Sequence, residues 1–263
     1  MSLAPIRITT LAGLTQGQDW RLSLAHDRDE HLLIWISRGQ GRLLLNGTRR
    51  GFGTHNAIYV PAGTLFSLEI GRQVIGQVAR VPVGTEARLP KGPRQLRLRD
   101  SAAIAEITAL LDAAEREARA GRALVQDTLD AYLGLLSVWL RRQITLPEHL
   151  PAPLNAASRL SVQACARIAA HHASPMTISD HAAALEVTPT HLARACKAAT
   201  GHTAADLLTQ RVLHAARTEL VETDAPMQDI ARHLGFGSAA YFTRFIQART
   251  GQTPTALRSA AAR

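Results

Sequence analysis

The pattern of apolar and polar positions divides the chain into a strand-rich part followed by a helix-rich part. From Arg21 to about Val81, short apolar runs alternate with turn residues in the segments RLSLAHD, HLLIWIS, GRLLLNG, AIYVPAG, TLFSLEI and VIGQVARV. Asn46 and Gly47 follow one of these runs, and both residues tolerate the positive φ that a tight hairpin turn needs. Strands this short and this regularly spaced predict a small barrel or sandwich.

Alternation does not show which face of the segment HLLIWIS points inward, because its alternate positions are about equally apolar on the two sides. A set of apolar side chains in this part is a candidate lining for a ligand pocket, and ordinary core is the alternative. The set is Leu33, Ile34, Trp35, Tyr59 and Phe66.

Helical periodicity begins after the segment RLPKGPRQLRLRD. Apolar residues recur at helical spacing from Ile104 to Ala114 and again from Leu129 to Leu140, with Gly121 between the two runs. The pattern predicts two amphipathic helices within about 103–142, which pack either on the barrel or on a second copy of the chain. The next segment, TLPEHLPAPLNAAS, carries three prolines in a polar setting and is typical of a linker.

The helical C-terminal part repeats itself at a spacing of 50 residues. THLARACKAATGHTA, residues 190–204, aligns with AYFTRFIQARTGQTP, residues 240–254, so that Arg194 matches Arg244 and Gly201 matches Gly251. Each copy follows a short helix and a turn, HAAALEVT or IARHLGFG. The sequence therefore predicts two helix-turn-helix units, at about 179–199 and 228–248.

The second helix of each unit has a polar or small-residue face opposite its apolar stripe, because residues advance by about 100° each. Small residues allow close approach to the DNA major groove, and arginine pairs bidentately with guanine. An ordinary solvated face is the alternative, but the arginine at the same outward position in both units favours DNA contact. The candidate DNA-binding residues are Thr190, Ala193, Arg194, Lys197, Ala240, Thr243, Arg244 and Gln247.

The segment ADLLTQRVLHAARTELVE joins the two units, and its apolar positions predict one amphipathic helix. The expected buried positions are Leu208, Val212, Ala215, Ala216 and Leu220. A helix of about 18 residues spans roughly 27 Å, which suits two recognition helices in successive major-groove segments. Arg211 and Arg217 on this helix are candidate phosphate contacts, although solvated helix arginines are commoner.

Charge agrees with a polyanionic partner. The 263-residue chain has a formal net charge of +9, and residues 150–263 hold 11 Lys and Arg against 7 Asp and Glu. Cys165 and Cys196 lack CxxC spacing, so each is expected to be a small buried residue. We expect a cytoplasmic protein, since neither a membrane span nor the apolar core of a signal peptide is visible.

The C-terminal hundred residues resemble the DNA-binding domain of the AraC/XylS family of bacterial transcription regulators. The resemblance rests on TPTHLARACKAATGHT, QRVLHAARTEL, IARHLGF, YFTRF and TGQTP, in that order. It implies a double helix-turn-helix that binds asymmetric DNA sites, with an N-terminal domain for effector binding or dimerisation. Five positions depart from the family pattern: His181, Glu186, Cys196, Ile246 and Gln247.

The strand-rich part, with SRGQGRLLLNG and IYVPAGTLFSLEI, is similar to the cupin-type barrel that many family members carry. Cupins often hold a metal through an HxH pair, but His26, His31 and His55 lack this spacing, and Phe66 stands where related sequences often place histidine. The chain also contains no G-x-S-x-G elbow, P-loop or HExxH motif. We therefore expect no catalytic residue, no metal and no cofactor.

The sequence thus predicts an α+β protein with a cupin-like effector-binding or dimerisation domain at 1–144, a linker at 145–158 and an AraC-type DNA-binding domain at 159–263. The predicted function is sequence-specific regulation of transcription, in which the protein acts as an activator. The expected partners are double-stranded DNA, RNA polymerase, a small-molecule effector and a second copy of the chain. The alternative is a cupin-type enzyme or ligand-binding protein with a degenerate DNA-binding module.

Overall fold

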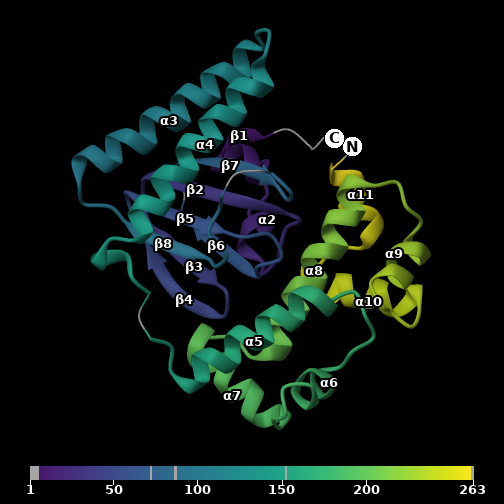
Figure 1. Ribbon diagram of the computed structural model, residues 1–263. Coiled ribbons are helices and arrows are strands. Elements are labelled where there is room, and N and C mark those ends of the chain that lie inside the picture. The colour runs from purple at the N-terminus through teal and green to yellow at the C-terminus, as the bar shows by residue number, and fades with distance from the viewer. Residues whose placement is uncertain (1–5, 72, 86–87, 152, 262–263) are drawn as a thin grey trace. The chain divides into compact units, whose positions relative to one another are not determined.

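The computed structural model describes residues 6–71, 73–85, 88–151 and 153–261 (Figure 1). The chain forms two compact units. The first comprises Met1–Ser23, Asp27–Leu45 and Arg50–Leu154, and the second comprises Leu24–His26, Asn46–Arg49 and Asn155–Arg263. Antiparallel sheets and helices build the first unit, and helices dominate the second, so the expected α+β fold class is confirmed.

The strands form two antiparallel sheets. One has the strand order β1-β7-β2-β5-β8 and the other the order β4-β3-β6. The turn between β3 and β4 places Asn46 at φ 44° and Gly47 at φ 73°, as predicted for an Asn-Gly hairpin. The strand bounds are β1 Arg7–Thr10, β2 Glu30–Arg38, β3 Gly41–Leu45, β4 Thr48–Phe52, β5 Asn56–Val60, β6 Phe66–Ile70, β7 Ile75–Pro82 and β8 Arg94–Arg97.

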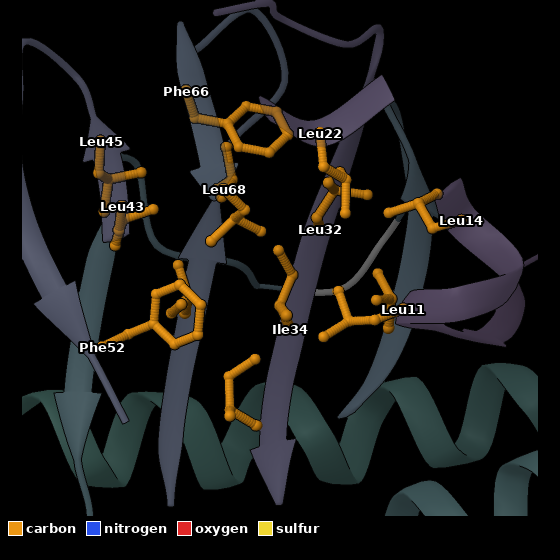
Figure 2. Packing of buried hydrophobic residues seen from close by; sticks show 14 residues of the cluster. Leu11, Leu14, Leu22, Leu32, Ile34, Leu43, Leu45, Phe52, Phe66 and Leu68 are labelled. Carbon is orange, nitrogen blue, oxygen red and sulfur yellow. The ribbon is translucent and has the colours of Figure 1, made fainter. Parts of the chain in front are cut away.

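A hydrophobic core fills the space between the two sheets, and Figure 2 shows its side chains pointing toward one another. Leu32, Ile34 and Ile36 of β2 face this core and are completely buried. The short helices α1 (Leu11–Thr15) and α2 (Trp20–Ser23) add further leucines to it. The other members include Leu11, Leu14, Leu22, Leu43, Leu45, Phe52, Phe66 and Leu68.

The opposite face of β2 packs against two long helices, α3 (Ser101–Ala120) and α4 (Val125–Ile144). Leu33 and Trp35 of β2, with Tyr59 of β5, lie in this second core. The five apolar residues predicted to share a pocket are therefore divided between two cores, because both faces of β2 are covered. The space left beside Leu33 and Tyr59 is only about 10 Å³.

Local capping chemistry fixes the two long helices. The side chain of Asp100 accepts hydrogen bonds from the N–H groups of Ala102 and Ala103, which begins α3. Gly121 ends α3 in the left-handed conformation at φ 58°, the role predicted for it as a break between the helices. The predicted helices within 103–142 thus correspond to α3 and α4.

Two local predictions differ from the structure, and one strand was not predicted. The segment RLSLAHD was expected to be a strand, but α2 covers its beginning: Leu22 N–H and Ser23 N–H both donate to Asp19 O. The segment RLPKGPRQLRLRD contains β8, which pairs with β5 at the edge of the larger sheet. The predicted linker contains the 3-10 helix η1 (Pro147–His149), and α5 begins within it at Ala156.

The second unit is built around α8, the helix that joins the two halves of the repeat. Leu213, Ala216 and Leu220 of α8 pack against Phe242 and Ile246 in one cluster. The helices α5, α6 and α7 precede α8, and α9, α10 and α11 follow it. Their bounds are α5 Ala156–His171, α6 Ile178–Ala183, α7 Pro189–Thr200, α8 Ala204–Glu222, α9 Met227–His233, α10 Ala239–Thr250 and α11 Pro254–Ala261.

The buried face of α8 differs from the predicted stripe. Leu208, Val212 and Ala215 are only partly buried, whereas Leu207 and Leu213 are buried. The physical reason is that α8 contacts α5 and α7 on one side of the repeat and α9, α10 and α11 on the other, so no single stripe suffices.

Three further observations concern predicted features. Arg211 is only 8% exposed and interacts within the chain, so its proposed role as a phosphate contact is wrong. Cys165 and Cys196 are free and buried, as expected, and burial raises the pKa of the Cys165 thiol to about 12. No helix in the described part of the chain is long and apolar enough to cross a membrane.

Candidate nucleic-acid interface

The helices α7 and α10 begin in the same way. Thr188 precedes α7, and its hydroxyl accepts a hydrogen bond from His191 N–H at 3.2 Å. Ser238 precedes α10, and its hydroxyl accepts from Tyr241 N–H at 3.1 Å. Each hydroxyl satisfies a backbone donor that a helix start leaves unpaired, so both helices have a defined first residue.

The two helices also end in the same way. Thr200 Oγ1 donates to Cys196 O at 2.7 Å and accepts from His202 N–H at 3.0 Å. Thr250 Oγ1 repeats both bonds, with Ile246 O at 2.8 Å and Gln252 N–H at 3.1 Å. Gly201 and Gly251 then take left-handed conformations, at φ 82° and 72°. The two copies of the sequence repeat therefore share the same hydrogen bonds as well as similar residues.

The apolar stripe of each helix is buried and fixes which side faces outward. Leu192, Ala195 and Cys196 are buried on α7, and Phe242 and Ile246 are buried on α10. Six of the eight candidate DNA-binding residues are exposed, and the other two, Ala193 and Thr243, are half-buried. The exposed six are Thr190, Arg194, Lys197, Ala240, Arg244 and Gln247.

The outward faces carry positive charge without acidic neighbours on the same helix. Arg194 and Lys197 are the cations of the α7 face, and Arg244 is the cation of the α10 face; neither helix sequence contains Asp or Glu. Thr243 Oγ1 donates to Ala239 O at 2.9 Å, so its hydroxyl oxygen remains as an acceptor. Such faces match base edges that present acceptors to guanidinium and donors to hydroxyl groups.

Two aromatic residues of the second helix-turn-helix unit make contacts that the sequence analysis did not predict. Tyr241 is 54% exposed, and its ring centroid lies 6.0 Å from the guanidinium carbon of Arg244. Phe236, in the turn before α10, contacts Phe242 and Phe245, with ring centroids 5.2 Å away in each case. The spacing of Tyr241 and Arg244, three residues apart on one helix, was the available signal for the first contact.

The turn of the first helix-turn-helix unit is less regular than the turn of the second. Glu186 takes φ 56° at the place where the second helix-turn-helix unit has Gly235 at φ 77°. His181 is 1% exposed at the position where the second helix-turn-helix unit has the buried Ile230. Burial lowers the pKa of His181, and the nearby Arg167 and His171 lower it further. The first helix-turn-helix unit thus keeps the backbone of the motif, with side chains that fit this backbone less well.

The histidines considered as metal ligands have other contacts. His31 Nδ1 accepts from Ala62 N–H at 3.1 Å, His55 stacks on Trp35 at a centroid distance of 5.9 Å, and His26 Nδ1 donates to Leu24 O at 2.9 Å. Among the described residues, no three His, Cys, Asp or Glu side chains gather as a metal ion would require.

Comparison with known proteins addresses the helical repeat directly. Residues 181–260 match the family model described as a helix-turn-helix domain. The bifunctional transcriptional activator/DNA repair enzyme AdaA of Bacillus subtilis (strain 168) is 35% identical to the chain over 71 residues. Residues 181–260 form a helix-turn-helix domain of the AraC type. The AdaA match spans 27% of this chain and about a third of AdaA, namely 34%.

Solved structures are also similar to the chain in part or in whole. The AraC-type domain matches the C-terminal domain of AraT, a response regulator from Geobacillus stearothermophilus, at 26% identity, with 41% of this chain and 88% of that chain covered and a TM-score of 0.38. ToxT from Vibrio cholerae matches over 96% of this chain and 97% of its own, at 10% identity and a TM-score of 0.44.

Proposed function

We propose that the protein is a sequence-specific DNA-binding transcription regulator. In this proposal the AraC-type domain binds double-stranded DNA with the outward faces of α7 and α10 against base edges in the major groove. The protein acts by binding rather than by catalysis, and it works in the cytoplasm, where its DNA target lies.

One observation carries the proposal: the two helix-turn-helix units present matched cationic faces, on helices that begin and end in the same way. Arg194 and Arg244 are exposed at equivalent positions, six residues before Thr200 and Thr250 respectively. A solvated surface needs no such match. Two equivalent arginines at fixed helix positions suit a ligand that itself repeats, as the major groove does.

The length of α8 agrees with this arrangement. Its 19 residues span about 28 Å, somewhat less than the 34–36 Å between successive major-groove segments on one side of the duplex. Because α8 contacts helices of both helix-turn-helix units, it acts as the common support for the two recognition helices. We therefore expect a binding site with two elements about one helical turn apart.

The experiment compares Arg244→Ala and Arg194→Ala with the wild type on a duplex selected from a random pool and on a shuffled duplex. We expect each change to cost about 1–3 kcal/mol on the selected duplex and little on the shuffled one, because a base-reading contact is lost. Arg232→Ala is the control. Its guanidinium is also exposed, but it lies on α9 and pairs with Asp229 at 3.0 Å.

Equal loss on both duplexes would assign the two arginines to phosphate contacts instead. Loss of selectivity in Arg232→Ala as large as in Arg244→Ala would contradict the assignment of the α10 face. Fluorescence anisotropy with labelled duplexes at fixed salt gives all of these affinities.

We further propose that α3 and α4 mediate a homodimer. Leu124 and Leu135 are 73% and 53% exposed, and Ala131 lies exposed between them at helical spacing. Leu135→Asp should shift a dimer to monomer in sedimentation velocity, whereas Leu150→Asp, at a leucine that is 64% exposed outside α4, should not. A wild type that is monomeric at micromolar concentration, with and without DNA, would contradict this.

The remaining partners follow from regulation itself. A regulator bound beside a promoter meets RNA polymerase, and the sheet-rich first unit is the expected place for a small-molecule effector. The full-length protein, the DNA fragment and purified RNA polymerase in one transcription assay test the first of these. A change in transcript level that requires Arg244 supports the proposal, and no change on a fragment that binds tightly counts against it.

A further inference from the structure

A pocket of about 370 Å³ opens in the first unit where an edge strand of each sheet meets η1. The strands are β4 and β8, which end the two sheet orders. The volume lies within the range of roughly 300–1,000 Å³ that is usual for small-molecule sites. Its lining residues are Arg50, Gly51, Gln95, Arg97, Glu148 and His149.

Hydrogen bonds across the junction of the two sheets hold the pocket wall in place. Gln95 Nε2 donates to Gly51 O at 2.8 Å and to Asn56 Oδ1 at 3.0 Å, and Arg97 Nη2 donates to Gly51 O at 3.2 Å. Both amide hydrogens of Gln95 are thus in use, which leaves its Oε1 as an acceptor.

The other side of the pocket is also fixed. His149 is 9% exposed, and its Nδ1 donates to Gln143 O at 2.9 Å, while its Nε2 lies 3.4 Å from Arg97 O. The Nδ1 bond ties η1 to the end of α4, and the ring lies beside Arg97 of β8. The wall formed by Gly51, Gln95, Arg97 and His149 is therefore held by hydrogen bonds before any ligand arrives, which lowers the ordering cost of binding.

The charged groups of the pocket determine what it can bind. Arg50 and Arg97 are exposed, and neither has an ion-pair partner among the residues that the structure describes. Guanidinium groups present several N–H donors in a planar fork that matches carboxylate and phosphate oxygens. Glu148 and Gln95 also line the pocket and carry acceptor oxygens, so a bare anion would use only part of the lining.

We propose that this pocket, named here the Arg50–Arg97 pocket, binds a small anionic molecule that also carries hydroxyl or amino groups. Its carboxylate or phosphate pairs with Arg50 and Arg97, and its donor groups meet Gln95 Oε1 and Glu148. The site does not depend on the proposed DNA-binding function, since a calorimetric measurement on the protein alone detects it.

The test titrates the full-length protein with citrate and with inorganic phosphate by isothermal titration calorimetry, at constant ionic strength set with chloride. We expect saturable binding at one site per chain. Arg50→Gln should weaken it at least tenfold, because a charge-assisted hydrogen-bonding partner is removed. Arg38→Gln is the matched control, since Arg38 is an exposed arginine of the same unit on β2, outside the pocket.

Arg97→Gln provides a second variant, and its thermal unfolding is recorded because Arg97 also bonds Gly51 O. Tighter binding of citrate assigns the anionic group to a carboxylate, and tighter binding of phosphate assigns it to a phosphate. Absence of saturable binding by both probes overturns the proposal, and so does equal weakening by Arg38→Gln. If Arg50→Gln weakens binding to random DNA but not to either probe, the pocket is a DNA backbone contact and the proposal is wrong.

Discussion

The two turns of the AraC-type domain predict opposite changes in folding stability when glycine is introduced in one turn and removed from the other. Glu186 and Gly235 occupy equivalent places, and both have positive φ, at 56° and 77°. A side chain in the left-handed region costs about 1–2 kcal/mol, whereas glycine loses roughly 0.5–1 kcal/mol more backbone entropy on folding. The difference makes Glu186→Gly stabilising by about 0.5–1 kcal/mol, because Glu186 is exposed and its side chain has no hydrogen bond in the described structure.

The reverse exchange at the second turn should cost more. A Cβ on Gly235 would lie 2.9 Å from Ser174 C and 3.0 Å from Ser174 O, and these backbone atoms cannot move as a flexible side chain can. Such overpacking costs about 1–3 kcal/mol in addition to the backbone strain. Gly235→Ala should therefore destabilise the second unit by about 2–4 kcal/mol.

Urea denaturation with two probes measures both effects. The three tryptophans, Trp20, Trp35 and Trp139, all lie in the first unit, so their fluorescence follows that unit, while circular dichroism at 222 nm follows the helices of both. With an m-value of about 2 kcal/mol/M, Gly235→Ala should lower the midpoint of the helical transition by at least about 1 M. A stable Gly235→Ala variant, or a destabilised Glu186→Gly variant, would refute the reasoning.

Two further predictions concern buried side chains of the second unit. Phe242→Ala should destabilise it by about 3–5 kcal/mol, because Phe242 is completely buried against Phe236 and α8; urea denaturation measures the loss. The pKa of His181 is lowered, so the unfolded chain binds the proton first, and stability should fall as pH drops through the unfolded value of 6.5. His181→Leu should remove this pH dependence, as thermal unfolding between pH 5 and 8 would show.

The outcomes that oppose these two predictions are equally definite. A Phe242→Ala variant within 1 kcal/mol of the wild type would mean that the cluster collapses around the missing ring. The charged groups that act on the His181 ring are Arg167 and His171 of α5 and Asp180 of its own helix, and only Asp180 favours the proton. An unchanged pH profile in His181→Leu would therefore assign the acid sensitivity to another group.

The repeat was visible in the sequence because its chemistry is local. Caps such as Thr188 and Ser238, and glycines such as Gly201 and Gly251, act within a few residues of the helix ends that they define. The outward faces of α7 and α10 followed from helical spacing alone. Whether those faces touch DNA stays a prediction.

The features that the sequence did not reveal depend on several layers at once. Alternation along β2 was uninformative because Ile34 faces the second sheet while Leu33 faces α3 and α4, and both environments are apolar. Arg211 looked like a surface residue, yet it is buried on a helix that both halves of the repeat cover. The pocket beside Arg50 joins three segments that lie far apart in the chain, so no motif could indicate it.

The most direct test of the central claim is the affinity of the full-length protein for a duplex selected from a random pool, compared with a shuffled duplex, at two salt concentrations. The account predicts at least about 10³-fold tighter binding to the selected duplex, and affinities for both that fall steeply as salt rises. Equal affinity for the two duplexes at both salt concentrations would contradict sequence-specific recognition by α7 and α10.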